Sequence, residues 1–289
     1  MKNVTDKVAA ITGAASGIGR ALALALAKQG CHVALSDLNE QGLAETASLA
    51  SSYNVNVTTT TLNVADRGAV HAWADSVVKD HGKVNMIFNN AGVALGGTVE
   101  DTDYSDYEWI MDINMWGVVY GTKAFLPHIQ QAGEGHIINI SSIFGIFAQP
   151  TQSAYNMSKF AVRGFTESLR QELDLSNNSV SATSVHPGGI KTNIAKNARM
   201  KKSVGKLTGG DSEKARRQFD AMFMTTPETA ANTILKAVTK NKRRVLIGPD
   251  GATRKEFEEA TGCALEIDSR TGIVHVTLPE GGDALLGLQ

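Results

Sequence analysis

The stretch Thr12-Gly13-Ala14-Ala15-Ser16-Gly17-Ile18-Gly19 decides the fold expected for this chain. It follows a short apolar run and opens a helical pattern rich in Ala and Leu. Glycines at such a turn let the backbone approach a pyrophosphate, and the helix N-terminus adds N–H groups and a positive dipole end. Because a strand precedes the turn and a helix follows it, the stretch predicts a dinucleotide-binding site.

Short β-branched runs alternate with longer helical patterns along the chain. Strands are expected at Lys7–Thr12, His32–Ser36, Val55–Leu62, Val84–Asn89, His136–Ser141, Val180–His186 and Arg244–Ile247. Helices are expected near 18–30, 40–53, 66–81, 103–131, 152–176 and 226–240. This alternation predicts right-handed crossovers and an α/β fold with a doubly wound parallel sheet. We expect that domain over residues 1–248 and an appendage, a helix plus a β-hairpin, over residues 249–289.

The overall composition places few constraints on function. The 289 residues carry a net charge of −1, so the balance gives no argument for nucleic acid or an acidic membrane surface. Cys31 and Cys263 are far apart and form no disulfide or metal framework. The chain enters a strand-like run at once, and its most apolar helical stretch, Ala21–Ala27, is too short to span a bilayer. We expect a cytoplasmic protein without a metal site or a membrane span.

Two further features lie at the same predicted edge of the sheet. Asp37 ends the second strand, 18 residues beyond Gly19, where a carboxylate can accept both ribose hydroxyls and would repel a 2′-phosphate. It therefore favours NAD over NADP, although an Asp there could instead cap the next helix. The run Asn89-Asn90-Ala91-Gly92 closes the fourth strand; it is either a second cofactor turn or a plain strand-to-loop turn.

Tyr155 and Lys159 stand four residues apart in a helical pattern, so both project from one face. A neighbouring ammonium favours the phenolate and so lowers the pKa of the phenol. A free tyrosine titrates near 10, roughly three units too high for a base at neutral pH. The pair therefore suits proton transfer; its alternative is an ordinary surface contact.

With the glycine turn, the N-N-A-G run and Y-N-M-S-K in one chain, residues 5–248 resemble the short-chain dehydrogenase/reductase family. The resemblance implies a Rossmann fold, hydride transfer between NAD and a secondary alcohol or ketone, and a homodimer or homotetramer. It implies four catalytic residues: Asn114, Ser142, Tyr155 and Lys159. Ser142 would hold the substrate oxygen, in preference to its neighbour Ser141, and Asn114 would hold a water that links Lys159 to solvent.

The resemblance also implies a cofactor site. Its members would be Gly13, Ser16, Gly17, Ile18, Gly19, Asp37, Asn63, Val64, Asn90, Gly92, Tyr155, Lys159, Pro187, Gly188 and Thr192. Lys159 would bind the nicotinamide ribose, and Thr192 the carboxamide. One departure is Asn63, where the family usually has Asp; it affects contacts to the adenine and leaves the chemistry untouched.

Other conspicuous residues are expected to be structural. We expect Trp73, Trp109 and Trp116 to serve packing or interfaces, and the isolated histidines, His186 among them, to be structural. Residues 190–225 form a long insertion that is typical of a lid. Its soft apolar residues Met200, Phe219, Met222, Phe223 and Met224 suit a lipophilic substrate or ordinary lid packing.

The tail after Gly248 continues beyond the dehydrogenase pattern. With a helix at 252–261 and strands at 263–268 and 273–278, it resembles the later part of an archaeal KH domain, which suggests a chimera. Residues 249–289 hold three basic and eight acidic side chains, a net charge of 3 − 8 = −5, which is a poor match for phosphates. We therefore expect a packing appendage; an RNA-binding module and a nucleotide-binding protein without turnover are the alternatives. In a KH domain Val245–Ile247 would be helical, whereas its β-branched residues favour a strand.

Overall fold

The computed structural model of the chain describes residues 1–176, 179–207, 225–248, 264–267 and 274–277. Its centre is a seven-stranded sheet in the order β3-β2-β1-β4-β6-β7-β9, in which every neighbouring pair is parallel. The strands are β1 (Val8–Thr12), β2 (His32–Asp37), β3 (Val57–Thr61), β4 (Met86–Asn89), β6 (Gly135–Ile140), β7 (Val180–Pro187) and β9 (Arg244–Ile247). The strand order reverses between β1 and β4, which is where open α/β sheets bind their ligands.

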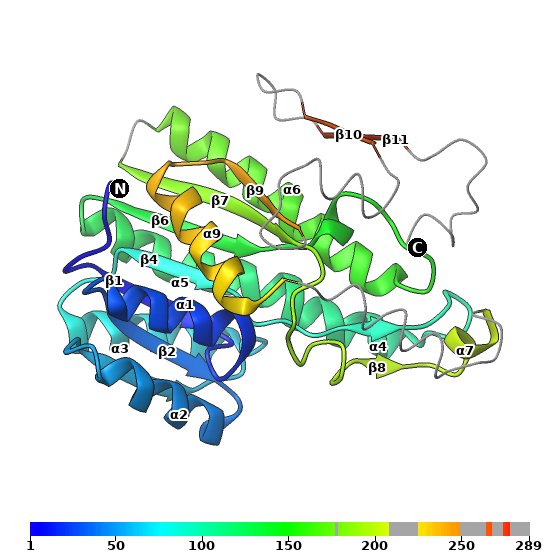
Figure 1. The fold of residues 1–289 in the computed structure, drawn as a ribbon, viewed down its shortest axis with the longest axis horizontal. Helices are drawn as coiled ribbons and strands as arrows, with labels where there is room; N and C mark the ends of the chain where they lie inside the picture. The colour runs from blue at the N-terminus through cyan, green and yellow to red at the C-terminus, as the bar shows by residue number, and fades with distance from the viewer. Residues whose placement is uncertain (177–178, 208–224, 249–263, 268–273, 278–289) are drawn as a thin grey trace.

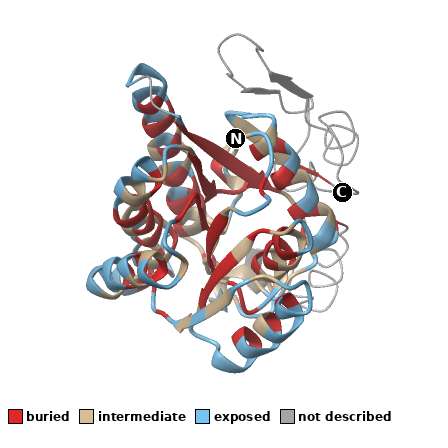
Figure 2. Ribbon diagram, turned by 90° about the vertical axis from the view of Figure 1, so that its left-hand side faces the viewer, coloured by how far each residue is buried: buried red, intermediate tan, exposed pale blue. Residues whose placement is uncertain are grey.

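Helices cover both faces of this sheet (Figure 1). They are α1 (Gly17–Lys28), α2 (Glu40–Ser51), α3 (Arg67–His81), α4 (Tyr104–Met111), α5 (Gly117–Gln131), α6 (Ser153–Leu175), α7 (Ser203–Leu207) and α9 (Pro227–Thr239). One apolar cluster joins the sheet to α1, α2 and α9, and a second joins it to α3, α5 and α6. Figure 2 shows the buried strands between helices that expose their outer sides. The predicted doubly wound parallel sheet is thereby confirmed.

Local signals explain where the elements begin and end. All five residues of β1 are buried, as expected for a parallel strand with both faces covered. The side chain of Asn39 accepts a hydrogen bond from Gly42 N and caps α2, and Asp66 does the same for α3 through Ala69 N. The cap of α2 is thus Asn39, and Asp37 is left for another role.

The expected helix 103–131 is interrupted. Between α4 and α5 lies a π-helical turn, Asp112–Trp116. A π-turn holds one residue more than an α-helical turn, and the single helix expected from the sequence did not include it. Two further elements were missed because they are only two residues long: β5 (Leu95–Gly96) and β8 (Arg199–Met200), which pair with each other.

Strand β9 pairs in parallel with β7, which confirms the strand predicted for Val245–Ile247. In the tail, β10 (Ala264–Ile267) and β11 (Val274–Thr277) form an antiparallel pair within the two predicted strands. The predicted helix 252–261, Cys263 and lid residues 208–224 lie outside the described residues, so the KH resemblance stays a prediction. Within the described part of the chain, no helix has the length and apolarity needed to cross a bilayer.

Candidate active site

Three turns meet where β1, β4 and β7 end. Gly13 and Gly17 have φ values of +67° and +54°, in the left-handed region that side chains other than glycine's disfavour. A Cβ atom on Gly13 would lie 2.9 Å from Ala91 Cα, and one on Gly17 would lie 3.0 Å from Thr192 Cγ2. The glycine turn, the N-N-A-G run and the loop at 187–192 are therefore in contact.

The first two turns are also joined by hydrogen bonds. The hydroxyl of Thr12 accepts from the backbone N–H groups of Asn90 at 2.9 Å and Ala91 at 3.0 Å. The Asn90 side chain donates to the carbonyl of Thr12 at 2.9 Å. Thr12 was not among the expected site residues, although it is the first letter of the motif. Its hydroxyl fixes the N-N-A-G run against the glycine turn.

The glycine turn fits a pyrophosphate. Helix α1 begins at Gly17, and its N-cap Ser16 makes no side-chain capping bond, so the first N–H groups of the helix remain for an anion. Ile18 is partly buried just inside the helix. A Cβ atom on Gly19 would lie 2.1 Å from Gly13 O, so only glycine allows the turn to close. These properties are those of a phosphate cradle.

Asp37 lies beside this cradle. Its carboxylate accepts from Ala15 N at 3.0 Å and from Asn39 N at 2.9 Å, and the residue is partly exposed. The chain therefore orients the carboxylate against the glycine turn. Past the end of β3, Asn63 accepts from Ala65 N at 3.1 Å, and Val64 packs close to the helix backbone of α5.

The loop at 187–192 is held at the other side. The N–H of Gly188 donates to Ile247 O at 2.7 Å, which ties the loop after Pro187 to the end of β9. Ile190 forms a bridge with Thr225, whose hydroxyl donates to Gly248 O. Thr192 accepts from Ile194 N at 3.4 Å. The edge strand thereby supports the loop expected to contact the cofactor.

Ser142, Tyr155 and Lys159 come together behind these turns. The Lys159 ammonium lies 5.6 Å from the centre of the Tyr155 ring and donates to Ile140 O at 3.1 Å. Ser142 caps the short 3-10 turn that begins at Ile143, and its hydroxyl accepts from Phe144 N at 3.1 Å. The hydroxyl of the neighbouring Ser141 instead donates to the carbonyl of Lys159. This bond ties Ser141 to the backbone of α6, and the choice of Ser142 as the catalytic serine stays a prediction.

The expected lowering of the Tyr155 pKa is wrong for the protein alone. Burial raises the pKa of Tyr155 to about 12, and a hydrogen bond with the Ser142 side chain acts in the opposite direction only in part. Burial also lowers the pKa of Lys159 to about 8. The Lys159 ammonium lies near the ring, but desolvation of the buried phenol is the larger effect. The phenol is therefore protonated at neutral pH.

Asn114 is held by the π-helical turn. The side chain is fully buried, accepts from Val93 N at 2.8 Å and donates to Val93 O at 2.9 Å. It also donates at 3.1 Å to the hydroxyl of Ser158, a partner that the motifs did not indicate. A Cβ atom on Gly92 would lie 3.2 Å from Asn114 Oδ1 and 3.4 Å from Lys159 Nζ. Because Gly92 has no side chain, the Asn114 amide and the Lys159 ammonium can both lie close to its Cα atom.

A cluster of charges fastens the segment after residue 198. Arg199 and Lys201 contact the carboxylate of Asp106 at 3.3 and 2.6 Å, and the Arg199 guanidinium lies 3.5 Å from the centre of the Trp109 ring. Lys201 also contacts Asp103 at 2.7 Å. The hydrogen bonds from Lys201 and Arg199 hold the pKa of Asp106 below its ordinary value. The attached segment contains β8, which pairs with β5.

Asp106→Asn is expected to loosen this segment. Asp106 is nearly buried and contacts two cations, so the neutral side chain leaves both without their central partner. Trypsin should then cleave after Arg199 or Lys201 about three to ten times faster, since cleavage follows local opening. Because the pKa of Asp106 is lowered in the fold, the stabilisation from these ion pairs is fully present at the pH of the trypsin assay and is lost only as the pH falls through that pKa. A cleavage rate unchanged by the substitution would show that the ion pairs do not hold the segment.

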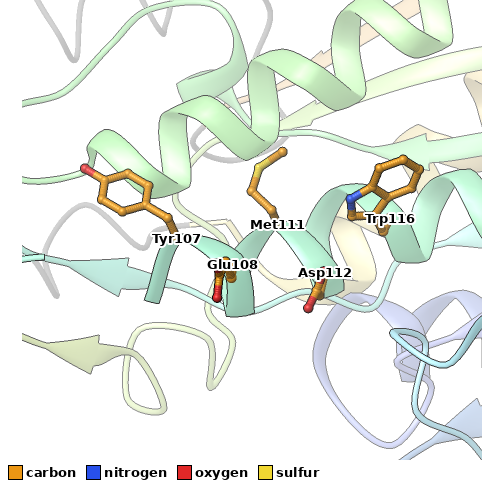
Figure 3. A pocket seen from close by; sticks show the side chains of 5 residues that line it. All are labelled: Tyr107, Glu108, Met111, Asp112 and Trp116. Carbon is orange, nitrogen blue, oxygen red and sulfur yellow. The ribbon is translucent and has the colours of Figure 1, made fainter. Parts of the chain in front are cut away.

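The three tryptophans, which were expected to serve packing or interfaces, lie in different surroundings in the fold. Trp73 is buried against Phe125 in an edge-to-face contact, which confirms packing. Trp109 packs under Arg199, whereas Trp116 is 42% exposed and stacks on Tyr120. A shallow depression of about 450 Å³ follows α4 and the π-helical turn (Figure 3); it is lined by Tyr107, Glu108, Met111, Asp112 and Trp116. None of the four expected catalytic residues lines it.

Comparison with known proteins identifies the family. The sequence profile described as short chain dehydrogenase matches residues 7–203, which is more than half of the chain. The chain belongs to the short-chain dehydrogenase family. This short-chain dehydrogenase is 49% identical over 249 residues to a Mycobacterium tuberculosis protein named as an oxidoreductase, SadH, with 86% of this chain and 88% of the relative covered.

More distant relatives and solved structures agree. This dehydrogenase is 33% identical over 248 residues to dehydrogenase/reductase SDR family member 7B of Xenopus tropicalis, covering 84% of this chain and 77% of that protein. A short-chain dehydrogenase/reductase from Burkholderia phymatum, solved in complex with NAD, has a TM-score of 0.77 at 29% identity and covers 85% and 90% of the two chains. Levodione reductase has a TM-score of 0.75 at 26% identity, with coverage of 87% and 100%.

Proposed function

We propose that this dehydrogenase transfers hydride between NAD and a secondary alcohol or ketone. The observation that carries the proposal is the meeting of Ser142, Tyr155, Lys159 and Asn114 at the sheet edge where the glycine turn forms a phosphate cradle. A bare nucleotide-binding protein would need the cradle alone. Burial shifts the pKa values of Tyr155 and Lys159, and shifted groups gathered beside a cofactor cradle favour catalysis.

The protein's own residues would handle the proton and the orientation. When bound, the nicotinamide ring supplies or accepts the hydride. The protonated phenol of Tyr155 is the form that donates to a ketone oxygen, and its high pKa keeps it in that form. Ser142 would donate a hydrogen bond to the same oxygen as negative charge develops on it. Lys159 and Asn114 flank Gly92. Lys159 would bind the nicotinamide ribose, and Asn114 would hold a water that links Lys159 to solvent.

NAD is proposed as the cofactor, with NADP disfavoured. Support comes from the fixed carboxylate of Asp37 beside the cradle and from the NAD complexes of the Burkholderia phymatum structure and of a Mycobacterium paratuberculosis short-chain dehydrogenase. The latter has a TM-score of 0.74 at 26% identity and covers 86% and 99% of the two chains. The glycines, Ser16, Ile18, Asn63, Val64, Asn90, Pro187, Gly188 and Thr192 would complete the site.

Asp37→Ala should narrow the preference for NAD over NADP by roughly tenfold, because a carboxylate that accepts ribose hydroxyls and repels a 2′-phosphate is removed. Steady-state kcat/KM with each cofactor measures this preference. Asp37→Asn is the matched control, since it keeps one acceptor for Ala15 N or Asn39 N without the charge. A wild-type enzyme that prefers NADP would show that Asp37 does not select the cofactor.

The substrate is proposed to be lipophilic. Ser142 is followed by Ile143, Phe144, Ile146 and Phe147, which are all partly exposed. Phe144 meets Phe147 and the Tyr155 ring edge to face, at centroid distances of 5.5 and 6.2 Å. An apolar wall beside a reactive hydroxyl favours apolar alcohols and ketones.

A screen of secondary alcohols, cyclic and steroidal ketones, and hydroxyacyl compounds, followed by NADH absorbance, tests the proposal. We expect turnover with at least one apolar class. NADH binding without turnover of any class would favour the alternative of a binding protein.

We also propose that the protein forms a homo-oligomer. Trp116 after α4 and Met157 and Phe160 on α6 are each at least 40% exposed, and the π-helical turn and α6 pack together. Exposed apolar residues on adjoining elements favour burial against a second copy. Sedimentation of the wild type should give a dimer or tetramer.

A further inference from the structure

His186 is a buried histidine that the proposed chemistry does not use. It stands next to the end of β7, where it pairs with Leu246 of β9, and its side chain is fully shielded from solvent. Its Nδ1 atom lies 2.9 Å from the carbonyl oxygen of Ser142, and its Nε2 atom lies 2.9 Å from the hydroxyl of Ser184. Each ring nitrogen therefore has one partner.

The partners determine which nitrogen carries the proton. A carbonyl oxygen only accepts, so Nδ1 must donate to Ser142 O. Nε2 of a neutral ring then accepts from Ser184, whose side chain lies on the same face of β7 because it is two residues away. Burial lowers the pKa of His186 to about 3, and the nearby cations Arg244, Arg163 and Lys159 also disfavour a charged ring. One neutral tautomer satisfies every contact.

Ser142 needs such a partner because the sheet ends before it. The paired register of β6 with β7 stops at Ile140 and Val185, and Ser141 N makes the last ladder bond to Val185 O. Beyond that point the imidazole takes the place of a strand partner for the Ser142 carbonyl. The Ser142 hydroxyl also lies 3.5 Å from Pro187 O. Neighbouring residues of β7 thus hold the backbone and the side chain of Ser142.

We propose that His186 is a positioning residue: its Nδ1–H group holds the Ser142 carbonyl and so aims the Ser142 hydroxyl at the oxygen that Tyr155 protonates. The proposal rests on the proposed function of this site. His186 itself touches neither substrate nor cofactor. Its effect should therefore appear in kcat, whereas the affinity for NADH should not change.

Kinetics of His186→Leu and His186→Asn test the proposal. The leucine variant lacks the donor, so kcat should fall about 10- to 100-fold, the size expected when a reacting group is misplaced by about 1 Å. The asparagine amide sits near the position of Nδ1 and should restore most of this loss. The Kd for NADH, measured by fluorescence, should stay within about twofold in both variants. A folded leucine variant with kcat within about twofold of the wild type would overturn the proposal.

His136 provides a matched control. It is also a buried histidine of the central sheet, but it lies near the start of β6, where its Nε2 atom is 2.7 Å from the hydroxyl of Thr183. His136→Leu should lower Tm and leave kcat unchanged. An equal loss of kcat in both leucine variants would mean that His186 acts through general stability. If His186→Leu does not fold, His186→Asn is compared with His186→Gln, whose amide lies near the position of Nε2. Equal kcat values for these two variants would also refute a positioning role for His186.

The tautomer can be measured without turnover. Long-range proton–nitrogen correlations of histidine-labelled protein should show His186 neutral from pH 6 to pH 9, with the proton on Nδ1, because burial lowers the pKa of His186 to about 3. A proton on Nε2, or a charged ring, would contradict the proposal. If the Nδ1 form is found but no alcohol or ketone is turned over, the proposed function fails and the hydrogen bond to Ser142 stands.

Discussion

Tyr155→Phe is expected to lower kcat by about a thousandfold, within the range found for loss of a general acid or base. The substitution removes one oxygen and keeps the ring, so the edge-to-face contact with Phe144 is preserved. Only the group that exchanges the proton with the substrate oxygen is lost. NADH binding should therefore persist, and stopped-flow measurement of a single turnover should show that the chemical step itself is slow.

Tyr107→Phe is the matched control for this variant. Tyr107 also carries a hydroxyl close to the start of α6, where it lies 2.8 Å from the hydroxyl of Ser153, but it is outside the proposed catalytic group. Its kcat should stay within about threefold of the wild type. A Tyr155→Phe enzyme that retains activity within tenfold would be evidence against proton transfer by this tyrosine.

Lys159→Met should lose activity and gain stability. At pH 7 the wild type holds a buried ammonium whose pKa has fallen from 10.5 to about 8, and this difference costs roughly 3 kcal/mol of folding free energy. Methionine relieves most of this cost and loses the hydrogen bond to Ile140 O, so Tm should rise by a few degrees. The same change removes the cation beside Gly92 and should lower kcat about 100-fold or more.

The lowered pKa of Lys159 makes the stability of the wild type depend on pH. Between pH 8 and pH 10.5 the unfolded chain binds the lysine proton more tightly than the folded one, so the stability of the wild type rises with pH. The difference in Tm between the variant and the wild type should therefore be largest near pH 7 and should shrink toward pH 10. Lys123→Met, at an exposed position of α5, should give no such gain. A wild type more stable than Lys159→Met at pH 7 would mean that the hydrogen bond outweighs desolvation.

The sequence predicted the parts of this protein that local pattern determines. All seven strands of the sheet follow from short β-branched runs, and the glycine turn follows from its position between strand and helix. Tyr155 and Lys159 could be paired because helical spacing alone brings them to one face. Asn114 and Ser142 depended on resemblance to a family, since neither a helical asparagine nor a serine after a strand has a distinctive local signature.

The features that were missed depend on packing between distant segments. The pKa of Tyr155 is set by how much of the chain surrounds it, so the nearby lysine gave the wrong direction. Ser158 and Thr12 hold their neighbours through hydrogen bonds whose partners are 44 and 78 residues away, at Asn114 and Asn90. Contacts of that range are not encoded in any short window of sequence.

The π-helical turn at Asp112–Trp116 has a consequence for how such a site can be lost. Because the turn is one residue longer than an α-helical turn, α4 and α5 would stay in phase as a continuous α-helix if one of its residues were deleted. The packing of α5 on α3 would survive, but the amide of Asn114 would rotate away from Val93 and Ser158. A single-codon deletion would thus convert an enzyme of this architecture into a folded binding protein. Point substitutions would reach the same result only by replacing one of the polar side chains at the site.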